Sequence, residues 1–82
     1  MLIPSDEKID WFRVIADLNG RGYSYTNIAV VVNDVTRNTV CYWRDGGTPR
    51  YEDGTSLLEL WSQVMGESQE FAPRIKRNSY LA

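Results

Sequence analysis

The stretch TRNTVCYWRDGGTP, residues 36–49, carries the clearest local pattern in the chain. Thr36 can cap a helix, because its hydroxyl can accept a hydrogen bond from a backbone N–H of the first turn. Val40 and Trp43 lie three residues apart, so they share one side of a helix with about 3.6 residues per turn. A double glycine then ends the pattern. The stretch therefore predicts a short helix over residues 36–45 whose closed side is Val40 and Trp43.

The open side of this predicted helix is rich in hydrogen-bonding groups. Beyond the threonines at its edges, Thr36 and Thr39, it carries Arg37, Asn38, Cys41, Tyr42 and Asp45. The major groove of DNA admits an α-helix, and arginine and asparagine pair bidentately with guanine and adenine. Arg37 and Asn38 stand at the N-terminal end, from which the second helix of a helix-turn-helix reaches the bases. The alternative is a solvated polar face on a three-helix core.

The preceding residues predict another capped helix, over residues 24–32. Ser24 can act as its N-cap, with Tyr23 and Ile28 flanking the cap as a hydrophobic staple. The same arrangement recurs around Thr36, where one valine precedes the cap and another stands at the fourth helical position. The β-branched run at the end of residues 24–32 is also compatible with a strand, but the cap signals favour the helix.

The link between these two helices is short. Only Asn33 and Asp34 separate the last valine of the first helix from the valine before Thr36, which indicates a tight turn. Two short capped helices, a tight turn and a glycine stop are typical of a helix-turn-helix. We therefore expect this motif at the centre of the chain.

Two further helices are expected to support the motif. The first covers residues 5–22, with Ser5 as its N-cap. The other covers residues 56–66, where Ser56 and Glu59 have the spacing of a capping box and a glycine ends the segment. The predicted fold class is all-α, a compact four- to five-helix bundle that contains a helix-turn-helix and has a short C-terminal tail.

The domain division follows from these elements. Residues 1–66 form the predicted helix-turn-helix domain, and residues 67–82 form the tail. The tail mixes cations with apolar residues, namely Arg74, Lys76 and Arg77 with Phe71, Ile75, Tyr80 and Leu81. It is compatible with a disordered basic arm, a dimer-forming strand or a final short helix.

Composition excludes several classes of function. The chain has 82 residues, which indicates one domain with a small core. It contains no histidine and one cysteine, so the common histidine-based catalytic sites and zinc sites are excluded. No glycine-rich phosphate loop is present. We therefore predict no enzymatic activity, no metal, no cofactor and no small-molecule substrate.

The N-terminal sequence lacks the basic start and apolar stretch of a signal peptide, and no apolar run is long enough to span a membrane. A single cysteine fits a reducing compartment. These features predict an intracellular protein with no membrane partner.

Residues 10–66, about two thirds of the chain, resemble the small helix-turn-helix domains of the phage Cro and repressor superfamily and of related prophage regulators. The matching residues are Ile28 and Ala29 in the first motif helix, residues 36–40 in the second, Trp43 after it, and residues 46–49. The segments DWFRVIADL and LLELW resemble the supporting helices of that family. One departure is that Asn33 takes the usual glycine position and the turn is one residue longer.

The resemblance implies a sequence-specific regulator of transcription that acts on double-stranded DNA in the cytoplasm of a bacterial host. It assigns base reading to Thr36, Arg37, Asn38, Cys41 and Tyr42. It assigns phosphate contacts to Tyr25, Thr26, Arg44 and Arg50, with Lys76 and Arg77 as further candidates.

The charge of the chain bears on this expectation. The net charge of -2 argues mildly against a nucleic-acid partner, yet residues 37–50 contain three arginines and one acid. Few phosphate contacts per subunit give weak binding at physiological salt, so a homodimer that reads two half-sites is expected. Candidates for its interface are Trp61, Phe71, Ile75, Tyr80 and Leu81, although core packing is favoured for Trp61. The alternative function is a protein-interaction module, namely an anti-repressor, a host-protein binder or a DNA-packaging adaptor.

Overall fold

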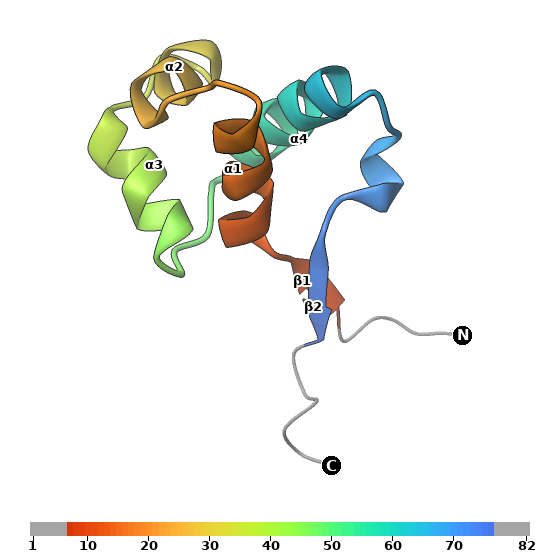
Figure 1. The fold of residues 1–82 in the computed structure, drawn as a ribbon. Coiled ribbons are helices and arrows are strands. Elements are labelled where there is room, and N and C mark those ends of the chain that lie inside the picture. The colour runs from red at the N-terminus through yellow and green to blue at the C-terminus, as the bar shows by residue number, and fades with distance from the viewer. Residues whose placement is uncertain (1–6, 77–82) are drawn as a thin grey trace.

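Four α-helices and two short strands make up the part of the chain that the structure describes, residues 7–76 of a computed structural model (Figure 1). In chain order they are β1 (Glu7–Ile9), α1 (Trp11–Gly20), α2 (Tyr25–Val31), α3 (Arg37–Arg44), α4 (Tyr51–Met65), a 3₁₀ turn (Gln69–Phe71) and β2 (Arg74–Lys76). The helical class predicted from the sequence is confirmed. The small sheet was not predicted.

The sheet ties the two ends of the described chain together. Strands β1 and β2 are antiparallel, with Lys8 opposite Ile75 at the centre of the register. The backbone N–H of Asp10 extends this contact by donating to the Pro73 carbonyl at 2.9 Å. The described part of the tail forms a short 3₁₀ helix and then a strand that pairs within its own chain. Tyr80 and Leu81 lie outside the described residues.

Helix α1 begins later than the sequence predicted. Its N-cap is Asp10, whose carboxylate accepts a hydrogen bond from the backbone N–H of Arg13 at 3.3 Å. The residues before Asp10 are extended because they pair with β2. The predicted start at Ser5 is therefore wrong for the helix, and Ser5 itself lies outside the described residues. The C-terminal end fits the prediction, since α1 ends at Gly20.

Helix α4 begins earlier than predicted, at Tyr51 with Arg50 in the N-cap position. The predicted capping box at Ser56 and Glu59 is wrong, because both residues lie inside the helix. Two acidic residues in the first turn favour the earlier start, since negative charge is stabilising at a helix N-terminus. At the other end Gly66 adopts φ 72° as a left-handed C-cap, as the sequence indicated.

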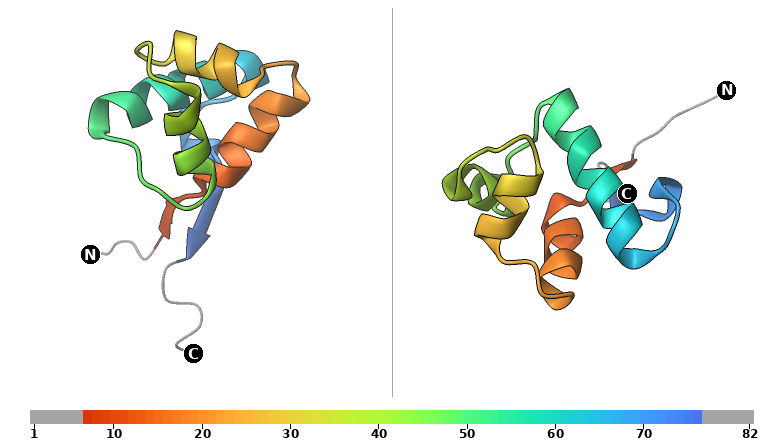
Figure 2. Two further views of the ribbon diagram at one scale, coloured as in Figure 1. Left: turned by 90° about the vertical axis from the view of Figure 1, so that its left-hand side faces the viewer. Right: turned by 90° about the horizontal axis from the view of Figure 1, so that it is seen from above.

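The core lies where the four helices meet. Helix α1 contacts α3 and α4, and α2 packs on α3, so α1 lies between the α2–α3 pair and α4 (Figure 2). The buried apolar residues are Val14, Ile15, Leu18, Ile28, Ala29, Val32, Val40, Trp43, Leu57, Leu60, Trp61 and Ala72. Trp61 is 3% exposed and its indole N–H donates to the Asp17 carboxylate at 2.9 Å. Core packing of Trp61 is thereby confirmed, and this side chain is withdrawn from the candidate dimer interface.

The turn between α2 and α3 has an unusual backbone. Asn33 and Asp34 adopt φ 52° and 53°, the left-handed conformation that asparagine and aspartate tolerate better than most residues. The side chain of Asn33 is also fixed from α4: its amide donates to Asp53 at 2.8 Å and its carbonyl accepts from the Ser56 hydroxyl at 3.4 Å. This contact sets the position of the turn against α4.

Substitution of Asn33 tests this role of the turn. Asn33→Ala removes both side-chain hydrogen bonds and places alanine at a positive φ, so we expect a loss of about 1–3 kcal/mol of unfolding free energy. Asn33→Gly removes the same bonds but accepts the backbone conformation, so its loss should be smaller. Urea denaturation of the two variants measures the difference. Equal stability of the alanine variant and the wild type would contradict the assigned role.

Candidate nucleic-acid interface

Helix α3 has one fully buried side and one open side. Val40 is 0% exposed and Trp43 is 3% exposed, as the spacing predicted. The Thr36 hydroxyl caps the helix by accepting from the backbone N–H of Thr39 at 3.2 Å, and the two threonine hydroxyls lie 2.9 Å apart. Because the closed side is anchored in the core, the side chains of the open side are carried on a fixed element. Side chains held on a rigid helix in this way are suited to binding a partner at defined positions.

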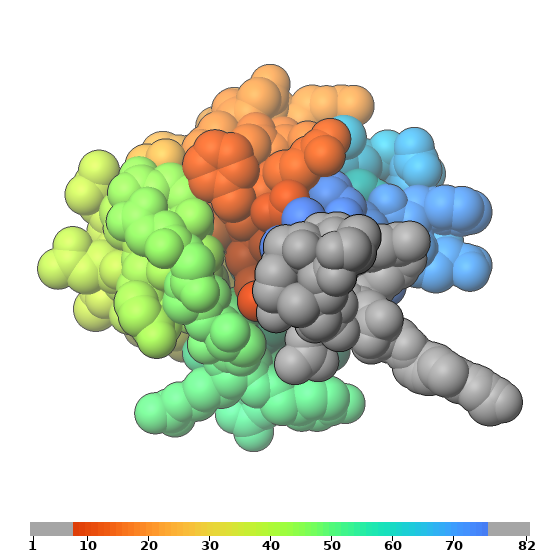
Figure 3. Space-filling model, turned by 90° about the horizontal axis from the view of Figure 1, so that it is seen from below, coloured from red at the N-terminus to blue at the C-terminus, as the bar shows by residue number. Residues whose placement is uncertain are grey.

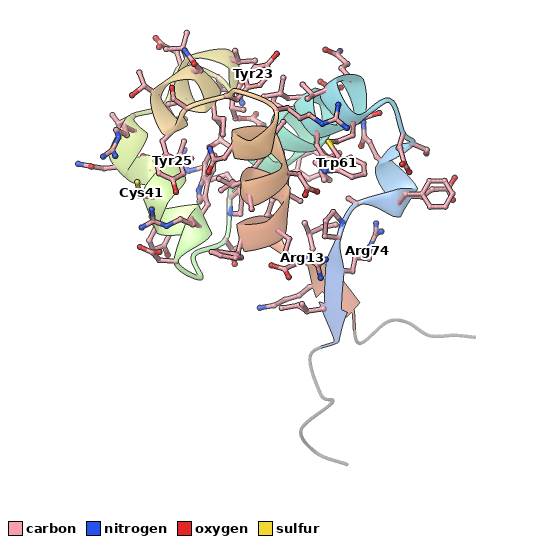
Figure 4. The ribbon with its side chains drawn as sticks, in the orientation of Figure 1. Arg13, Tyr23, Tyr25, Cys41, Trp61 and Arg74 are labelled. Atoms are coloured by element: carbon pink, nitrogen blue, oxygen red, sulfur yellow. The ribbon has the colours of Figure 1, made fainter. Side chains whose placement is uncertain are left out.

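Helix α2 is capped in the same way, and its cap places Tyr25 beside α3. The Ser24 hydroxyl accepts from the backbone N–H of Asn27 at 3.0 Å, and the Asn27 side chain accepts from the backbone N–H of Ser24 at 3.3 Å. Tyr25, the first residue of the helix, is half-buried. Figure 4 shows its side chain between the start of α2 and the surface of α3 that carries Cys41.

Two arginines of α3 converge on the ring of Tyr25. The guanidinium carbons of Arg37 and Arg44 lie 5.5 Å and 5.2 Å from the ring centroid, within the range of a cation–π interaction. Arg44 also donates from Nη1 to the Tyr25 hydroxyl at 3.1 Å. Its Nε and Nη2 donate to the two carboxylate oxygens of Asp45 at 2.8 Å and 3.0 Å. We call these four residues, Tyr25, Arg37, Arg44 and Asp45, the tyrosine–arginine cluster.

The charges of the cluster are partly compensated. The hydrogen bonds to Asp45 and then to Tyr25 raise the pKa of Arg44, and the same bond from Arg44 lowers the pKa of the Asp45 carboxyl. Asp45 is therefore ionised at neutral pH and holds Arg44 as an ion pair. Among the described residues no carboxylate lies within ion-pair distance of Arg37. Arg37 is thus the cation of the cluster whose charge remains available to a partner.

The other predicted contact residues of α3 lie around its open side. Asn38 is exposed, and Cys41 is half-buried beside the cluster. Tyr42 is 62% exposed, and its ring covers Gly47 so closely that a Cβ at that position would overlap it. Thr26, next to Tyr25 on α2, is exposed. The structure therefore gathers these predicted side chains on the surface formed by α3 and the start of α2.

Arg50 stands apart from the tyrosine–arginine cluster. It lines an open polar groove of about 680 Å³ between the α2–α3 turn and the start of α4. The groove is also lined by Asn33, Val35, Thr36, Thr39, Glu52, Asp53 and Ser56. Thr39 lies about 160° around α3 from Arg37, on the other flank of the helix. The predicted residues therefore occupy both flanks of α3, with Asn38 and Tyr42 on the ridge between them.

The end of α3 adjoins the start of α1. A smaller hollow of about 150 Å³ separates them, with Phe12 and Ile75 among its lining residues. Seen from below, α3 and the loop after it lie beside this part of α1 (Figure 3). Arg44 reaches the rim of the hollow, so this hollow borders the tyrosine–arginine cluster.

Two kinds of site were sought within residues 7–76. No group of three or more histidine, cysteine or acidic side chains there is placed to hold a metal ion. None of the helices in that range is both long and apolar enough to cross a membrane.

Comparison of the chain with protein-family models, with curated proteins and with solved structures finds no match in any of the three. The function therefore has to be inferred from the residues of this surface themselves.

Proposed function

We propose that the protein is a sequence-specific DNA-binding regulator of transcription, of phage or prophage type, in which α2 and α3 act as a helix-turn-helix. The observation that carries this proposal is the construction of α3. Its closed side is fully buried, while Arg37 and Asn38 stand exposed in its first turn. A helix built in this way can enter the major groove and present planar hydrogen-bonding groups to base edges.

Each side chain of α3 has a role in this arrangement. Arg37 would pair with a guanine edge and Asn38 with an adenine edge. Tyr42, further along the helix, would contact a thymine methyl group or a phosphate. Cys41 is compact, so it allows the helix to approach the bases closely.

Residues on neighbouring elements at either side of α3 would hold the DNA backbone. Thr26 is exposed next to Tyr25 at the start of α2, and Arg50 lines the groove on the Thr39 side of α3. Phosphate contacts from both sides would fix the register of the helix in the groove without reading sequence. The phosphate role predicted for Arg44 stays a prediction, since the structure shows its guanidinium shared between Asp45 and Tyr25.

The acidic composition does not oppose the Arg37 side of this surface. Asp17 bonds to Trp61 of α4, and Asp10 caps α1. Glu52 and Asp53 lie in the first turn of α4 and line the same groove as Arg50, so that side of the surface carries negative as well as positive charge. At the C-cap of α3 stands Asp45, which is paired with Arg44. The uncompensated positive charge of Arg37 therefore remains on the surface proposed to face DNA.

Two subunits would act together. A single subunit supplies few cations on this surface, and each neutralised phosphate contributes about 0.9 to the slope of log affinity against log salt. A homodimer doubles the contacts and places two α3 helices in successive major grooves, about 34 Å apart. The expected binding site is therefore a pseudo-palindrome.

A second candidate function is a protein-interaction module. It is favoured by two apolar side chains on the outer surface of α2, Val30 and Val31, which are 61% and 54% exposed. Such a surface suits a protein partner better than a phosphate backbone. In this case the protein would act as an anti-repressor, a host-protein binder or a packaging adaptor.

Selection from a random pool of genomic double-stranded fragments separates the two functions. The protein is incubated with the pool at increasing salt, and the retained fragments are sequenced. We expect enrichment of a pseudo-palindromic site whose retention falls steeply as salt rises. No retention at low salt would overturn DNA binding and leave the protein-interaction module.

A further inference from the structure

Tyr25 is held at both ends of its side chain. Its backbone belongs to the capped first turn of α2, and its hydroxyl accepts a hydrogen bond from Arg44 at 3.1 Å. Arg44 is in turn fixed by the two-point contact with Asp45, at 2.8 Å and 3.0 Å. The ring of Tyr25 is therefore a fixed surface next to α3, and within residues 7–76 its neighbour Arg37 makes no side-chain hydrogen bond or ion pair.

The contact between Arg37 and this ring leaves its donors available. At 5.5 Å from the ring centroid the guanidinium is attracted to the ring through its charge, and this contact needs none of its N–H donors. The same N–H groups form the two parallel hydrogen bonds to O6 and N7 of guanine. A long arginine side chain otherwise loses considerable rotational freedom when it binds, so a preset orientation favours the bound geometry.

We infer that Tyr25 is a positioning residue that presets the guanidinium of Arg37 for bidentate contact with a guanine, and that Arg44 and Asp45 hold Tyr25 in place. This inference rests on the proposed function. It changes the role of two predicted phosphate contacts, because Tyr25 and Arg44 then act on sequence preference through Arg37 and need not touch the DNA.

The decisive variants separate the ring from its hydroxyl. Tyr25→Leu removes the ring, and Tyr25→Phe keeps the ring but removes the hydrogen bond from Arg44. Binding is measured on the selected site, on the same site with its Arg37-contacted G·C pair replaced, and on non-specific DNA. The Arg37-contacted pair is identified beforehand as the base pair at which the Arg37→Ala variant loses its preference for G·C. Thermal melting of each variant checks that it is folded.

Tyr25→Leu should lower discrimination at that base pair about fivefold, the scale of one cation–π contact, with non-specific affinity unchanged. Tyr25→Phe should lower discrimination less. Asp45→Asn should lower discrimination while raising non-specific affinity, since it frees Arg44 and removes a negative charge. A fall in discrimination together with a rise in non-specific affinity is not expected if the cluster contributes only its charge. Wild-type discrimination in a folded Tyr25→Leu variant would overturn the inference.

A measurement without DNA examines the contact directly. The Nε–H proton of Arg37 in the wild type should have an NMR resonance shifted upfield by the Tyr25 ring, and the shift should vanish in Tyr25→Leu. A resonance identical in both proteins would also overturn the inference. If the wild type shows the shift but selects no DNA site, the proposed function is what fails.

Discussion

Replacement of Trp43 by alanine is expected to lower the free energy of unfolding by about 3–5 kcal/mol, the cost of deleting a large buried aromatic side chain. Trp43 is 3% exposed and lies in the core cluster, on the closed side of α3. A domain of this size has only about 5–15 kcal/mol of stability in total. Each kcal/mol corresponds to about 4–8 °C, so the melting temperature should fall by at least about 12 °C.

Calorimetry of three proteins measures this effect. Trp43→Phe keeps an aromatic side chain in the core and should lose less stability than Trp43→Ala. Asn38→Ala changes an exposed residue of the same helix and should stay within about 0.5 kcal/mol of the wild type. A Trp43→Ala melting curve that overlies the wild-type curve would mean that α3 is rotated and that a different set of residues forms its open side.

The central helices could be predicted from the sequence because their signals are local. The N-caps Ser24 and Thr36 act on backbone groups only three residues away. The spacing of Val40 and Trp43 places both on one side of α3, which is the side that is buried. The left-handed conformation of Asn33 has the same local origin, because asparagine tolerates it.

The outer elements could not be predicted because distant contacts set their ends. The extended residues before Asp10 depend on pairing with Arg74–Lys76, at the other end of the described chain. Ser56 resembles an N-cap in sequence, but its hydroxyl donates to Asn33, which is 23 residues away. A pattern read along the chain contains no information on either contact.

The sequence indicated which residues form the candidate site, but it did not indicate which of them contact one another. Arg37 was identified from its place on the open side of the predicted helix, whereas Arg44 and Tyr25 were assigned through the family resemblance. Their convergence on one ring depends on how α2 packs against α3, so no spacing rule signals it. Asp45 was seen only as an acid on the open side, whereas the structure gives it a two-point bond to Arg44. The sequence thus indicated which residues form the surface. The packing of α2 on α3 determines that Arg44 is bound to Asp45 and Tyr25, whereas Arg37 contacts the ring of Tyr25 alone.

Replacement of Arg37 by alanine is expected to weaken binding to the selected DNA site by about 1–3 kcal/mol, the value of one bidentate contact to guanine. The loss should be largest at one G·C pair of each half-site. Arg37 is exposed, so the fold should be unaffected apart from the lost contact with Tyr25. Binding is measured by titration against the selected site and against single-base variants of it.

Two control variants separate base reading from simple charge. Arg37→Lys keeps the charge but lacks the planar fork of guanidinium donors, so it should bind non-specific DNA normally and still lose discrimination. Arg13→Ala removes one positive charge from an exposed residue of α1 and should leave discrimination intact. A base contact predicts a loss that depends on sequence. A phosphate contact instead predicts equal weakening on every sequence and a salt slope reduced by about one. The second result would place Arg37 on the DNA backbone and assign base reading to Asn38 and Tyr42.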